Sequence, residues 1–590
     1  MYFVRYYVLL FLSFFILNLK VFGEDSVIKL QIIKSGTKTE KDIKKLPNSA
    51  SLIDSNDIEM SNARAVTDVL ENLPGIFIKK TSALGRADVN IRGIGDKGRQ
   101  IGVFIDGRPD KMGIFGCSVT QSLPMNNIEK MEIIRGPESV LYGSEAFGGV
   151  VNIVTKRAKE KLEGSFKASA GTYNSQNYRF QLGSKINKLD YYISADKSST
   201  DGHIENSGYN ANDLSGQIGY KLSEKSDLSI SGKNFNGIKY EPVPSASFSW
   251  NDYDRGSLDV TYTKTCSGSK SFIKGYRSFG EHEFSDGWHS KDYTNGLMLH
   301  SMMNILRSNE LSMGLDYRYQ WGKVLGGAPV LGEYNKYEYG MYVNDEHTFF
   351  DKMTIVGGLR YNHDEYAGDI TVPKVGIVYN TLQKTIIRGI VSQGFRAPQI
   401  NDLYLFSSAN SDLKSEKIWN HEVGIKHEIS KATNIDIAGY VMKGEDMIEI
   451  RSGKKQNIGE FEFRGFETSF NTKINNRMSG SINYSFLDPG EKTSGRPGDQ
   501  IGVELKYDND KIDGIIYGEY VGSYYANDNS ANKIDDYIVL NTKLIYNLSK
   551  DLDIFAEVNN ILNEQYEILN DNGLYKMPGA ALNIGVKHNF

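Results

Sequence analysis

The sequence has only two cysteines, Cys117 and Cys266, among its 590 residues. Two cysteines are too few for a fold that disulfide bonds stabilise. They could pair in an oxidising compartment, although cysteines this distant in a long chain more often stay apart. Basic residues are not in excess either, because 68 lysines and arginines stand against 73 aspartates and glutamates. This balance lacks the basic surface that nucleic acids require, so we expect no nucleic-acid partner.

Long apolar runs are missing after the first 23 residues. Those 23 residues are typical of a secretory signal peptide, with Arg5 as the basic start, an apolar stretch over 6–17 and a cleavage site at 21–23. Asn18 and Lys20 interrupt the stretch, which is shorter than the roughly 18 to 20 residues of a membrane anchor. The exported chain is therefore soluble, or it crosses a membrane as a closed barrel in which every backbone group finds a partner.

Glycine and aromatic residues are abundant instead, with 59 glycines, 36 tyrosines and 27 phenylalanines. From about residue 161, apolar and polar residues alternate over short segments, as at 189–196 and 353–361. Polar turns such as 549–551 separate these segments. Period two over about ten residues is typical of a transmembrane β-barrel. The last segment ends on Phe590, which resembles the C-terminal signal of outer-membrane proteins.

The region before residue 161 follows a different pattern. Residues 61–73 place apolar side chains on one face of a predicted helix, and Pro74 and Gly75 end it. Short apolar strands are predicted at 88–91, 102–105 and 131–134. This mixture predicts a small α+β domain.

A series of motifs resembles the TonB-dependent receptor family, and the resemblance covers nearly the whole mature chain. The N-terminal region carries NLPGI at 72–76, VNIRG at 89–93, VFIDG at 103–107, IEKMEIIRGP at 128–137, SVLYG at 139–143 and GGVVNIVT at 148–155. Later landmarks are GFRAP at 394–398, LKSEK at 413–417 and VNNILN at 558–563. Ser415 stands where the family usually has proline, a departure that costs only turn rigidity.

The resemblance implies an all-β membrane protein of the bacterial outer membrane. It implies a 22-stranded antiparallel barrel over residues 161–590 and an N-terminal α+β plug domain over 41–160 in its lumen. Residues 24–40 would form a periplasmic leader. The length of 161–590 fits 22 spanning strands of roughly 9 to 11 residues with short loops. A monomer in outer-membrane lipid is the family expectation.

The leader contains a segment that resembles the family's Ton box: Leu30, Gln31, Ile32, Ile33, Lys34 and Ser35. An extended apolar segment suits strand addition onto the sheet edge of a partner. By resemblance, that partner is the periplasmic protein TonB with its inner-membrane energising complex. An ordinary disordered leader is the alternative.

By the same resemblance, Arg92 and Arg135 of the plug would meet Glu422 and Glu467 of the barrel wall. Two guanidinium and two carboxylate groups balance in charge and can form bidentate hydrogen bonds. The cluster would act as a static clamp, or it would take part in registering and releasing the plug. A buried ionic cluster is weak evidence of net stability.

The resemblance implies TonB-dependent import of a scarce nutrient complex and no catalysis; no nucleophile elbow or metal-spaced cluster stands out. A ferric siderophore or cobalamin fits best. Haem is weaker, because residues 395–413 lack histidine, although His203, His282 and His289 remain possible ligands. Another metal complex or a carbohydrate is a further alternative. Candidate ligand contacts at the outer mouth are Arg86, Met112, Ile114, Phe115, Trp288, His289, Tyr404, Phe406, Tyr524 and Tyr525.

Two alternatives accompany these site predictions. Aromatic residues also form interfacial belts around barrels, so aromaticity alone does not mark a ligand site. Asp201 and Asp213 are candidate loop ligands for calcium, although acidic loop residues are usually only solvated. No intrinsic cofactor is expected. A passive porin is disfavoured because the plug would obstruct it, and an adhesin would need neither plug nor Ton box.

Overall fold

The computed structural model describes residues 31–95, 98–242, 250–306, 308–327, 331–382, 384–571 and 573–590. The predicted signal peptide at 1–23 lies outside these ranges, as do residues 24–30 of the leader. Within the described ranges, no helix is long and apolar enough to cross a membrane.

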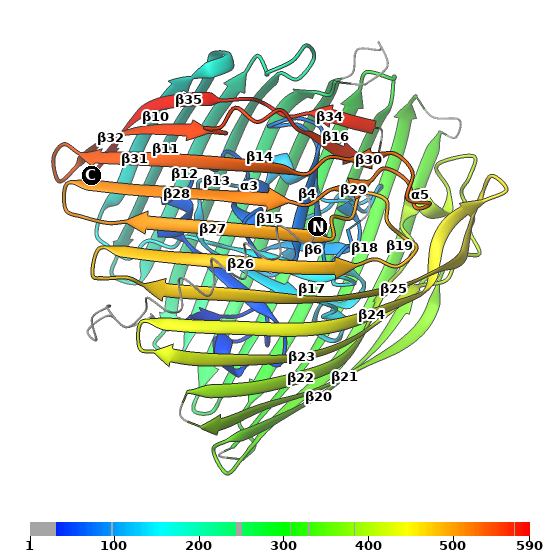
Figure 1. Cartoon of the computed structure of the whole chain (residues 1–590). Coiled ribbons are helices and arrows are strands. Elements are labelled where there is room, and N and C mark those ends of the chain that lie inside the picture. The colour runs from blue at the N-terminus through cyan, green and yellow to red at the C-terminus, as the bar shows by residue number, and fades with distance from the viewer. Residues whose placement is uncertain are drawn as a thin grey trace.

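Twenty-two antiparallel strands close into a barrel (Figure 1), which confirms the predicted fold. Each strand pairs with the next along the chain, and the first and last strands pair to close the sheet. The strands are β10(Glu163–Gly171), β11(Ser175–Ile186), β12(Leu189–Thr200), β13(Tyr209–Ser223), β14(Ser226–Tyr240), β15(Trp250–Cys266), β16(Ser269–Phe284), β17(His289–Met303), β18(Asn309–Gly326), β19(Gly332–Phe349), β20(Met353–Asp364), β21(Gly368–Leu382), β22(Thr385–Arg396), β23(Glu416–Ser430), β24(Thr433–Arg451), β25(Lys454–Lys473), β26(Met478–Asp488), β27(Asp499–Tyr507), β28(Ile512–Val521), β31(Tyr537–Asn547), β32(Leu552–Asn559) and β35(Ala581–Asn589).

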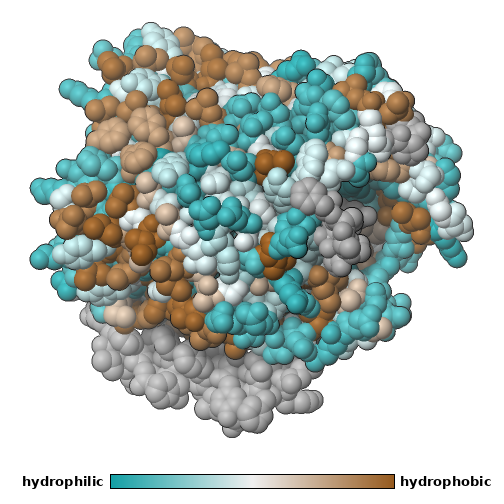
Figure 2. Space-filling view, turned by 90° about the horizontal axis from the view of Figure 1, so that it is seen from above, coloured by the Kyte–Doolittle hydropathy of each residue, from teal (hydrophilic) through white to brown (hydrophobic). Residues whose placement is uncertain are grey.

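The alternation in the sequence becomes the two faces of this barrel. Leu258, Leu297 and Leu315 lie on its outer face and are about half exposed. Charged and polar side chains such as Arg360 and Asp292 point inward and are buried. Figure 2 shows hydrophobic residues gathered over the left half of the visible face, whereas hydrophilic residues prevail towards the right. An apolar outside around a polar inside is the pattern of a barrel that meets lipid.

The two ends of the barrel differ in the length of their connections. At the end that carries the C-terminus the turns are short, as at 187–188, 224–225 and 267–268. The opposite end has longer connections that contain α5(Ile400–Leu403), β29(Tyr524–Tyr525), β30(Lys533–Ile534), β33(Glu567–Asn570) and β34(Gly573–Lys576). Short turns face the periplasm in outer-membrane barrels and long loops face outward, so this asymmetry orients the molecule.

The plug fills the lumen with a five-stranded sheet in the order β3-β8-β9-β6-β7. Its elements are β3(Ala50–Asp54), β8(Ile128–Arg135), β9(Gly149–Thr155), β6(Ile101–Ile105), β7(Arg108–Pro109), the hairpin β4(Ile76–Lys80) and β5(Ala87–Ile91), and the helices α2(Ser55–Met60), α3(Val66–Leu70) and α4(Ser139–Tyr142). Single 3₁₀ turns lie at Ile43–Lys45, Thr120–Ser122, Gly143–Glu145 and Thr172–Asn174. The largest apolar core joins this sheet to Tyr440, Met442 and Phe463 of the barrel wall.

The helix predicted over 61–73 is shorter in the structure, where α3 covers only Val66–Leu70. The side-chain amide of Asn62 donates to the carbonyls of Thr542 and Val558 on the barrel wall. Residues before Val66 therefore run along the wall as a tether, and these contacts override local helix propensity. The strands predicted at 88–91, 102–105 and 131–134 lie within β5, β6 and β8. Both cysteines are free, with Cys117 in the plug and Cys266 at the periplasmic end of β15.

Candidate functional site

The leader segment that was predicted to contact TonB lies folded against the plug. Leu30 is outside the described residues. Ile32 and Ile33 form β1(Ile32–Ile33), which pairs with β2(Lys41–Asp42). Ser35 is fully buried, and its backbone N–H donates to Glu132 Oε2 over 2.8 Å. The segment is therefore a two-residue strand followed by a turn, and it is held against β8.

Glu132 is the main acceptor for this segment. Its carboxylate receives the backbone N–H of Lys34 at 2.9 Å as well as the N–H and the hydroxyl of Ser35. The Glu132 side chain is completely buried, and Lys130 Nζ lies 2.8 Å from its Oε1 atom. Lys130 also donates to the carbonyl of Ile32 at 2.7 Å. Charge-assisted hydrogen bonds are the strong ones, so this carboxylate holds the leader in place.

Glu132→Gln is expected to release the leader in the absence of ligand. A glutamine amide has one acceptor oxygen and a donor NH₂ group, so it cannot accept all three bonds that Glu132 accepts. Whichever way the amide is oriented, at least one bond is lost and its NH₂ group faces another donor; at about 1 to 2 kcal/mol, this makes proteolytic cleavage of the leader roughly tenfold faster. Limited proteolysis of purified protein measures this rate. Ser35→Ala removes a single bond and should accelerate cleavage less; equal rates in Glu132→Gln and wild type would contradict the assignment.

The four charged residues predicted to join plug and barrel lie together in the structure. Arg92 Nη1 is 2.7 Å from Glu422 Oε2, and Arg92 Nε is 2.8 Å from Glu467 Oε1. Arg135 Nε lies 2.9 Å from Glu467 Oε2. The ring of Tyr440 lies 4.1 Å from the Arg92 guanidinium carbon. We call Arg92, Arg135, Glu422 and Glu467 the ionic cluster.

The side chains of the ionic cluster are almost completely buried. Burial by itself disfavours a charged Arg92, yet the carboxylates of Glu422 and Glu467 more than offset it and raise the pKa of Arg92. Gly75 lies against the cluster with a φ of +71°, and a Cβ there would come within 2.1 Å of Glu467 Oε1. Glycine is required at this position for both reasons.

The cluster also contacts the chain that follows the leader. Glu422 Oε1 accepts the backbone N–H of Ser49 at 2.8 Å, and Arg135 Nη1 donates to Ser51 Oγ at 2.7 Å. Ser49 directly precedes β3, and Ser51 lies within it. Only about fourteen residues separate Ser35 from Ser49, so a pull on the leader reaches the ionic cluster early along the chain.

The aromatic ligand candidates separate into two groups. Phe115 at the plug apex lies 5.0 Å from Trp288 and 6.4 Å from Phe406 between ring centroids, and Trp288 lies 5.9 Å from Phe406. Phe406 is exposed, Phe115 half-buried and Trp288 buried with 4% of its surface exposed, so the three rings form an aromatic platform at the outer mouth whose accessible faces belong to Phe115 and Phe406. Tyr404 stacks on Tyr334 at 5.3 Å in the same region.

Several other candidates are placed differently from the prediction. Met112 and Ile114 are buried beneath the platform, with 2% and 0% of their surface exposed, so they support the rings and do not reach the mouth. Tyr524 is also buried, packed edge-on against Phe77 of the plug. Tyr525 is half-buried in β29 beside it. Arg86 lies at the mouth, paired with Asp88 and with Asp571 of the last outer loop.

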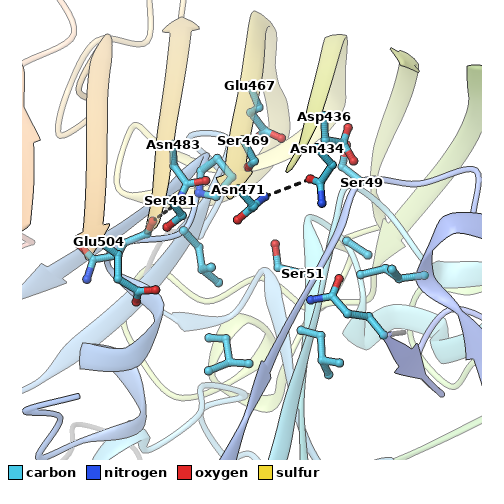
Figure 3. Close-up of a pocket in the computed structure, with 18 of the residues that line it drawn as sticks. Ser49, Ser51, Asn434, Asp436, Glu467, Ser469, Asn471, Ser481, Asn483 and Glu504 are labelled. Atoms are coloured by element: carbon cyan, nitrogen blue, oxygen red, sulfur yellow. Dashed lines mark hydrogen bonds between the residues drawn. The ribbon is translucent and has the colours of Figure 1, made fainter. Parts of the chain in front are cut away.

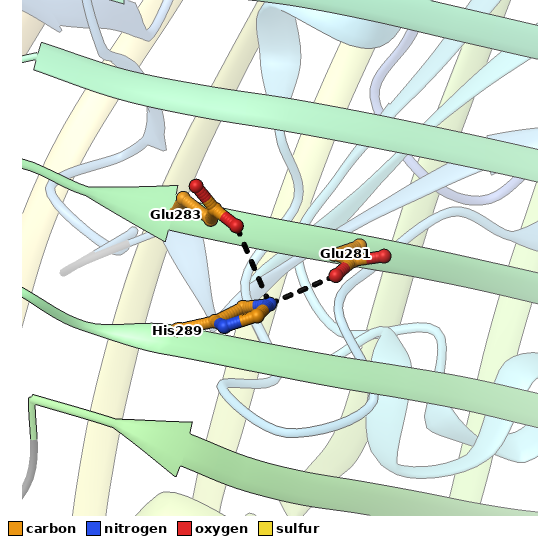
Figure 4. A group of neighbouring side chains, drawn as sticks. All are labelled: Glu281, Glu283 and His289. Atoms are coloured by element: carbon orange, nitrogen blue, oxygen red, sulfur yellow. Dashed lines mark hydrogen bonds and ion pairs between the residues drawn. The ribbon is translucent and has the colours of Figure 1, made fainter.

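His289 lies on the outer face of the barrel wall, not in the mouth (Figure 4). It neighbours Ser290 and Asp292, which point inward and are buried, so its own side chain points to the opposite face. Its Nε2 lies 2.8 Å from Glu281 and 3.5 Å from Glu283. Within the described ranges this is the one group of three side chains with metal-ligand spacing. Lys291 already pairs with Glu281 at 3.0 Å.

The two calcium candidates are not neighbours. Asp201 is in an outer connection and accepts from Asn174. Asp213 is inside strand β13, where it pairs in register with Asp196 rather than belonging to a loop. Asp213 is therefore a strand residue and not the loop residue that was predicted, because β13 begins four residues before it.

Two cavities lie between the plug and one sector of the wall, and no motif in the sequence predicted either of them. The outer cavity measures about 540 Å³ and is lined by six cationic residues, Lys79, Arg99, Arg396, Lys455, Lys492 and Arg496, and six anionic ones, Asp402, Glu416, Glu449, Glu460, Asp528 and Asp571. The inner cavity of about 390 Å³ opens towards the short turns. Figure 3 shows part of its lining, with Asn471 bonded to Asn434 and with Ser51 of the plug near them.

A plugged 22-strand barrel with an N-terminal leader on its periplasmic side defines a class of gated outer-membrane receptors. Two family descriptions match the chain: TonB-dependent Receptor Plug Domain over residues 42–150, and TonB dependent receptor-like, beta-barrel over residues 161–561. The chain therefore belongs to the TonB-dependent receptor family, a family of receptors and transporters of the bacterial outer membrane.

Individual relatives are distant but match over nearly their whole length. The vitamin B12 transporter BtuB of Vibrio vulnificus (strain YJ016) is 23% identical over 574 residues, 89% of each chain. The iron-regulated outer membrane virulence protein of Vibrio cholerae is 23% identical over 603 residues, covering 89% of this chain and 90% of that one. Among solved structures, the siderophore receptor PirA from Acinetobacter baumannii has a TM-score of 0.80 at 18% identity, over 92% of this chain and 98% of that chain.

Proposed function

We propose that the protein imports a metal chelate of the siderophore or cobalamin kind into the periplasm, driven by TonB. The observation that carries this proposal is the path from Ser35 through Ser49 to the ionic cluster, which links the leader mechanically to the plug. The plug fills the lumen, so a large solute cannot diffuse through. An outer membrane holds no ATP, so the energy for opening has to arrive through a periplasmic contact.

TonB is the proposed partner at the leader. Once freed from Glu132, the apolar stretch from Ile32 to Ile33 offers unpaired backbone groups to the edge of a partner's sheet. Ligand binding at the outer mouth would bias the leader towards this released state. A TonB protein energised by the inner-membrane complex would then pull on the chain and loosen the contacts at Ser49 and Ser51.

The outer mouth suits a chelate that combines flat rings with ionic or amide groups. The aromatic platform offers π faces, and the outer cavity offers equal numbers of cations and anions. Relatives named for vitamin B12 and for iron regulation, and a fold neighbour named as a siderophore receptor, support this class.

Haem is a less suitable ligand for this mouth. Neither His282 nor His289 points into it, because His282 is buried against Arg255 and His289 lies on the outer face. His203 contacts the carbonyl of Lys576 at the rim. Of these three histidines, only His203 could serve as an axial ligand for haem iron, after it breaks that contact.

Binding can be measured by titrating purified protein with ferric enterobactin, cyanocobalamin and haemin while intrinsic tryptophan fluorescence is followed. The chain has four tryptophans, and Trp288 is the one in the aromatic platform. We expect sub-micromolar quenching by one of the first two ligands. Trp288→Phe should remove most of the fluorescence change while Kd rises by less than about tenfold, because a ring still fills the site.

A control and a contrary outcome complete this experiment. Trp419 lies on the barrel strand β23, away from the platform, so Trp419→Phe should leave the fluorescence change intact. If all three ligands fail to bind, the proposal of a siderophore or cobalamin substrate is wrong, and nickel or copper complexes and carbohydrates become the next candidates.

A further inference from the structure

The inner cavity lies directly below the ionic cluster, along the wall formed by β22 to β28. Arg135 and Glu467 of the cluster are part of its lining. Below them, the wall presents amides and hydroxyls to the cavity, among them Ser469, Asn471 and Ser481, interspersed with charged side chains such as Asp436 and Glu504 (Figure 3). The plug side contributes Ser51 and its neighbours. The cavity is therefore a polar chamber that leads towards the periplasm.

The outer cavity occupies the same sector on the other side of the cluster. A small cavity of about 10 Å³ lies between the two, lined by Arg92 of the cluster and by Arg496. Arg496 also lines the outer cavity, and Arg92 contacts Glu467, which lines the inner cavity, so one side chain separates the small cavity from each of the other two. Its volume is about that of one water molecule. Asn90 lines it as well, with 2% of its surface exposed. Neither the nitrogen nor the oxygen of its side-chain amide has a hydrogen-bond partner among the described residues.

Two side-chain barriers separate these spaces. At the outer barrier, Arg496 Nε donates to the carbonyl of Gly93 at 2.9 Å, and its guanidinium lies 5.2 Å from the Phe463 ring. At the inner barrier, Arg92 bridges Glu422 and Glu467. Each barrier depends on an arginine that links plug to wall, and neither is a continuous stretch of plug backbone.

We propose that the three cavities form one transport passage along β22 to β28, with the Arg92–Glu467 pair as its inner gate and Arg496 as its outer gate. The passage would carry a hydrophilic solute rich in amide, hydroxyl or carboxylate groups. Conduction needs contacts that are favourable but weak and repeated. The Ser469, Asn471 and Ser481 wall provides interchangeable hydrogen bonds and no single deep site.

This inference rests on the proposed import function, since a passage matters only if the protein is a transporter. Its test needs neither ligand nor TonB. Arg92→Ala, Glu467→Ala and Arg496→Ala together remove both gates while Arg135 and Glu422 leave one positive and one negative charge in the cluster. We expect the purified triple variant in a planar lipid bilayer to pass an ionic current about tenfold above the wild-type baseline.

A matched control is another buried plug-to-wall ion pair. Glu138 lies 3.1 Å from Lys374 of β21, both almost fully buried, and neither lines any of the three cavities. Glu138→Ala with Lys374→Ala should therefore stay as tight as wild type. If this control leaks as much as the triple variant, the current reflects a loosened plug and the proposal is overturned.

A blocking substitution separates a passage from a lost plug. Adding Ser481→Trp to the triple variant should return the current to near the wild-type baseline, because the indole fills the inner cavity. Adding Ile482→Trp, on the opposite face of the same strand, should leave the current unchanged. The proposal is overturned if the triple variant stays closed. It is also overturned if the triple variant conducts but Ser481→Trp does not block the current. Resistance of the barrel to SDS verifies that every variant is folded.

The binding experiment and the conductance experiment test the two proposals independently. If no chelate binds but the triple variant conducts and is blocked, the passage stands and the substrate class falls. If a chelate is bound and imported but the triple variant stays closed, import is retained and the route lies elsewhere.

Discussion

Ile33→Pro is expected to reduce uptake of the bound chelate to about one hundredth of the wild-type rate, because proline cannot donate a backbone hydrogen bond to a partner strand. Binding at the outer mouth should be unchanged, since Ile33 lies at the opposite end of the barrel. Cells that carry each variant are supplied with radiolabelled ferric enterobactin or cyanocobalamin. Accumulation in the cell is compared with binding to the surface.

Ile33→Val is the matched control for this substitution. Valine keeps the N–H group and the extended backbone, so uptake should stay close to wild type. Uptake that survives Ile33→Pro would show that the leader is not the strand that the energising partner engages. Loss of binding in Ile33→Pro would instead indicate that the leader helps to shape the mouth.

Arg92→Met is expected to destabilise the plug more than any other single substitution discussed above. It leaves Glu422 and Glu467 buried without their main cation. Breaking a buried pair by removing one partner costs about 3 to 5 kcal/mol. Backbone amides of the plug should then exchange with deuterium roughly 10² to 10³ times faster, since about 1.4 kcal/mol corresponds to a factor of ten.

Arg92→Met combined with Glu467→Gln provides the comparison. The double variant keeps Arg135 and Glu422 as one cation and one anion, so exchange should accelerate far less than in the single variant. Equal acceleration in both would show that Arg92 acts through packing on Tyr440 rather than through charge. No acceleration in the single variant would show that the cluster does not hold the plug.

The sequence anticipated the features that depend on periodicity and on motifs. Alternation at 189–196 and 353–361 became β12 and β20, with apolar residues facing outward. Period two fixes which residues share a face, whatever the rest of the chain does. The motifs around Arg92 and Arg135 identified the plug, and both arginines lie against Glu422 and Glu467 in the structure.

Which face of a strand looks inward was harder to infer near the rim. His289 and Asp292 are three residues apart on β17 and lie on opposite faces. At the outer end both faces are polar, so hydropathy no longer distinguishes them, and a shift of one residue exchanges inside for outside. His289 was for this reason predicted as a ligand contact although it lies on the outer wall.

Burial at the plug apex could not be predicted either. Met112, Ile114 and Phe115 follow one another closely, yet only Phe115 reaches the aromatic platform. Trp288 comes from a connection more than 170 residues away along the chain. Only the closed barrel brings these segments together, and the local sequence does not indicate that they are neighbours.

By itself, the sequence determined the strands of the barrel and the turns of the plug, because alternation and glycine-dependent turns are local properties of the chain. The residues of the ionic cluster followed from the resemblance of the motifs to a known family. Only the tertiary structure decided what the leader contacts and where the cavities lie. Glu132 accepts Ser35 from 97 positions away, and the inner cavity joins residue 31 to residue 517. Such spaces exist between surfaces that the closing of the sheet brings face to face, so they arise only when the barrel forms around the plug.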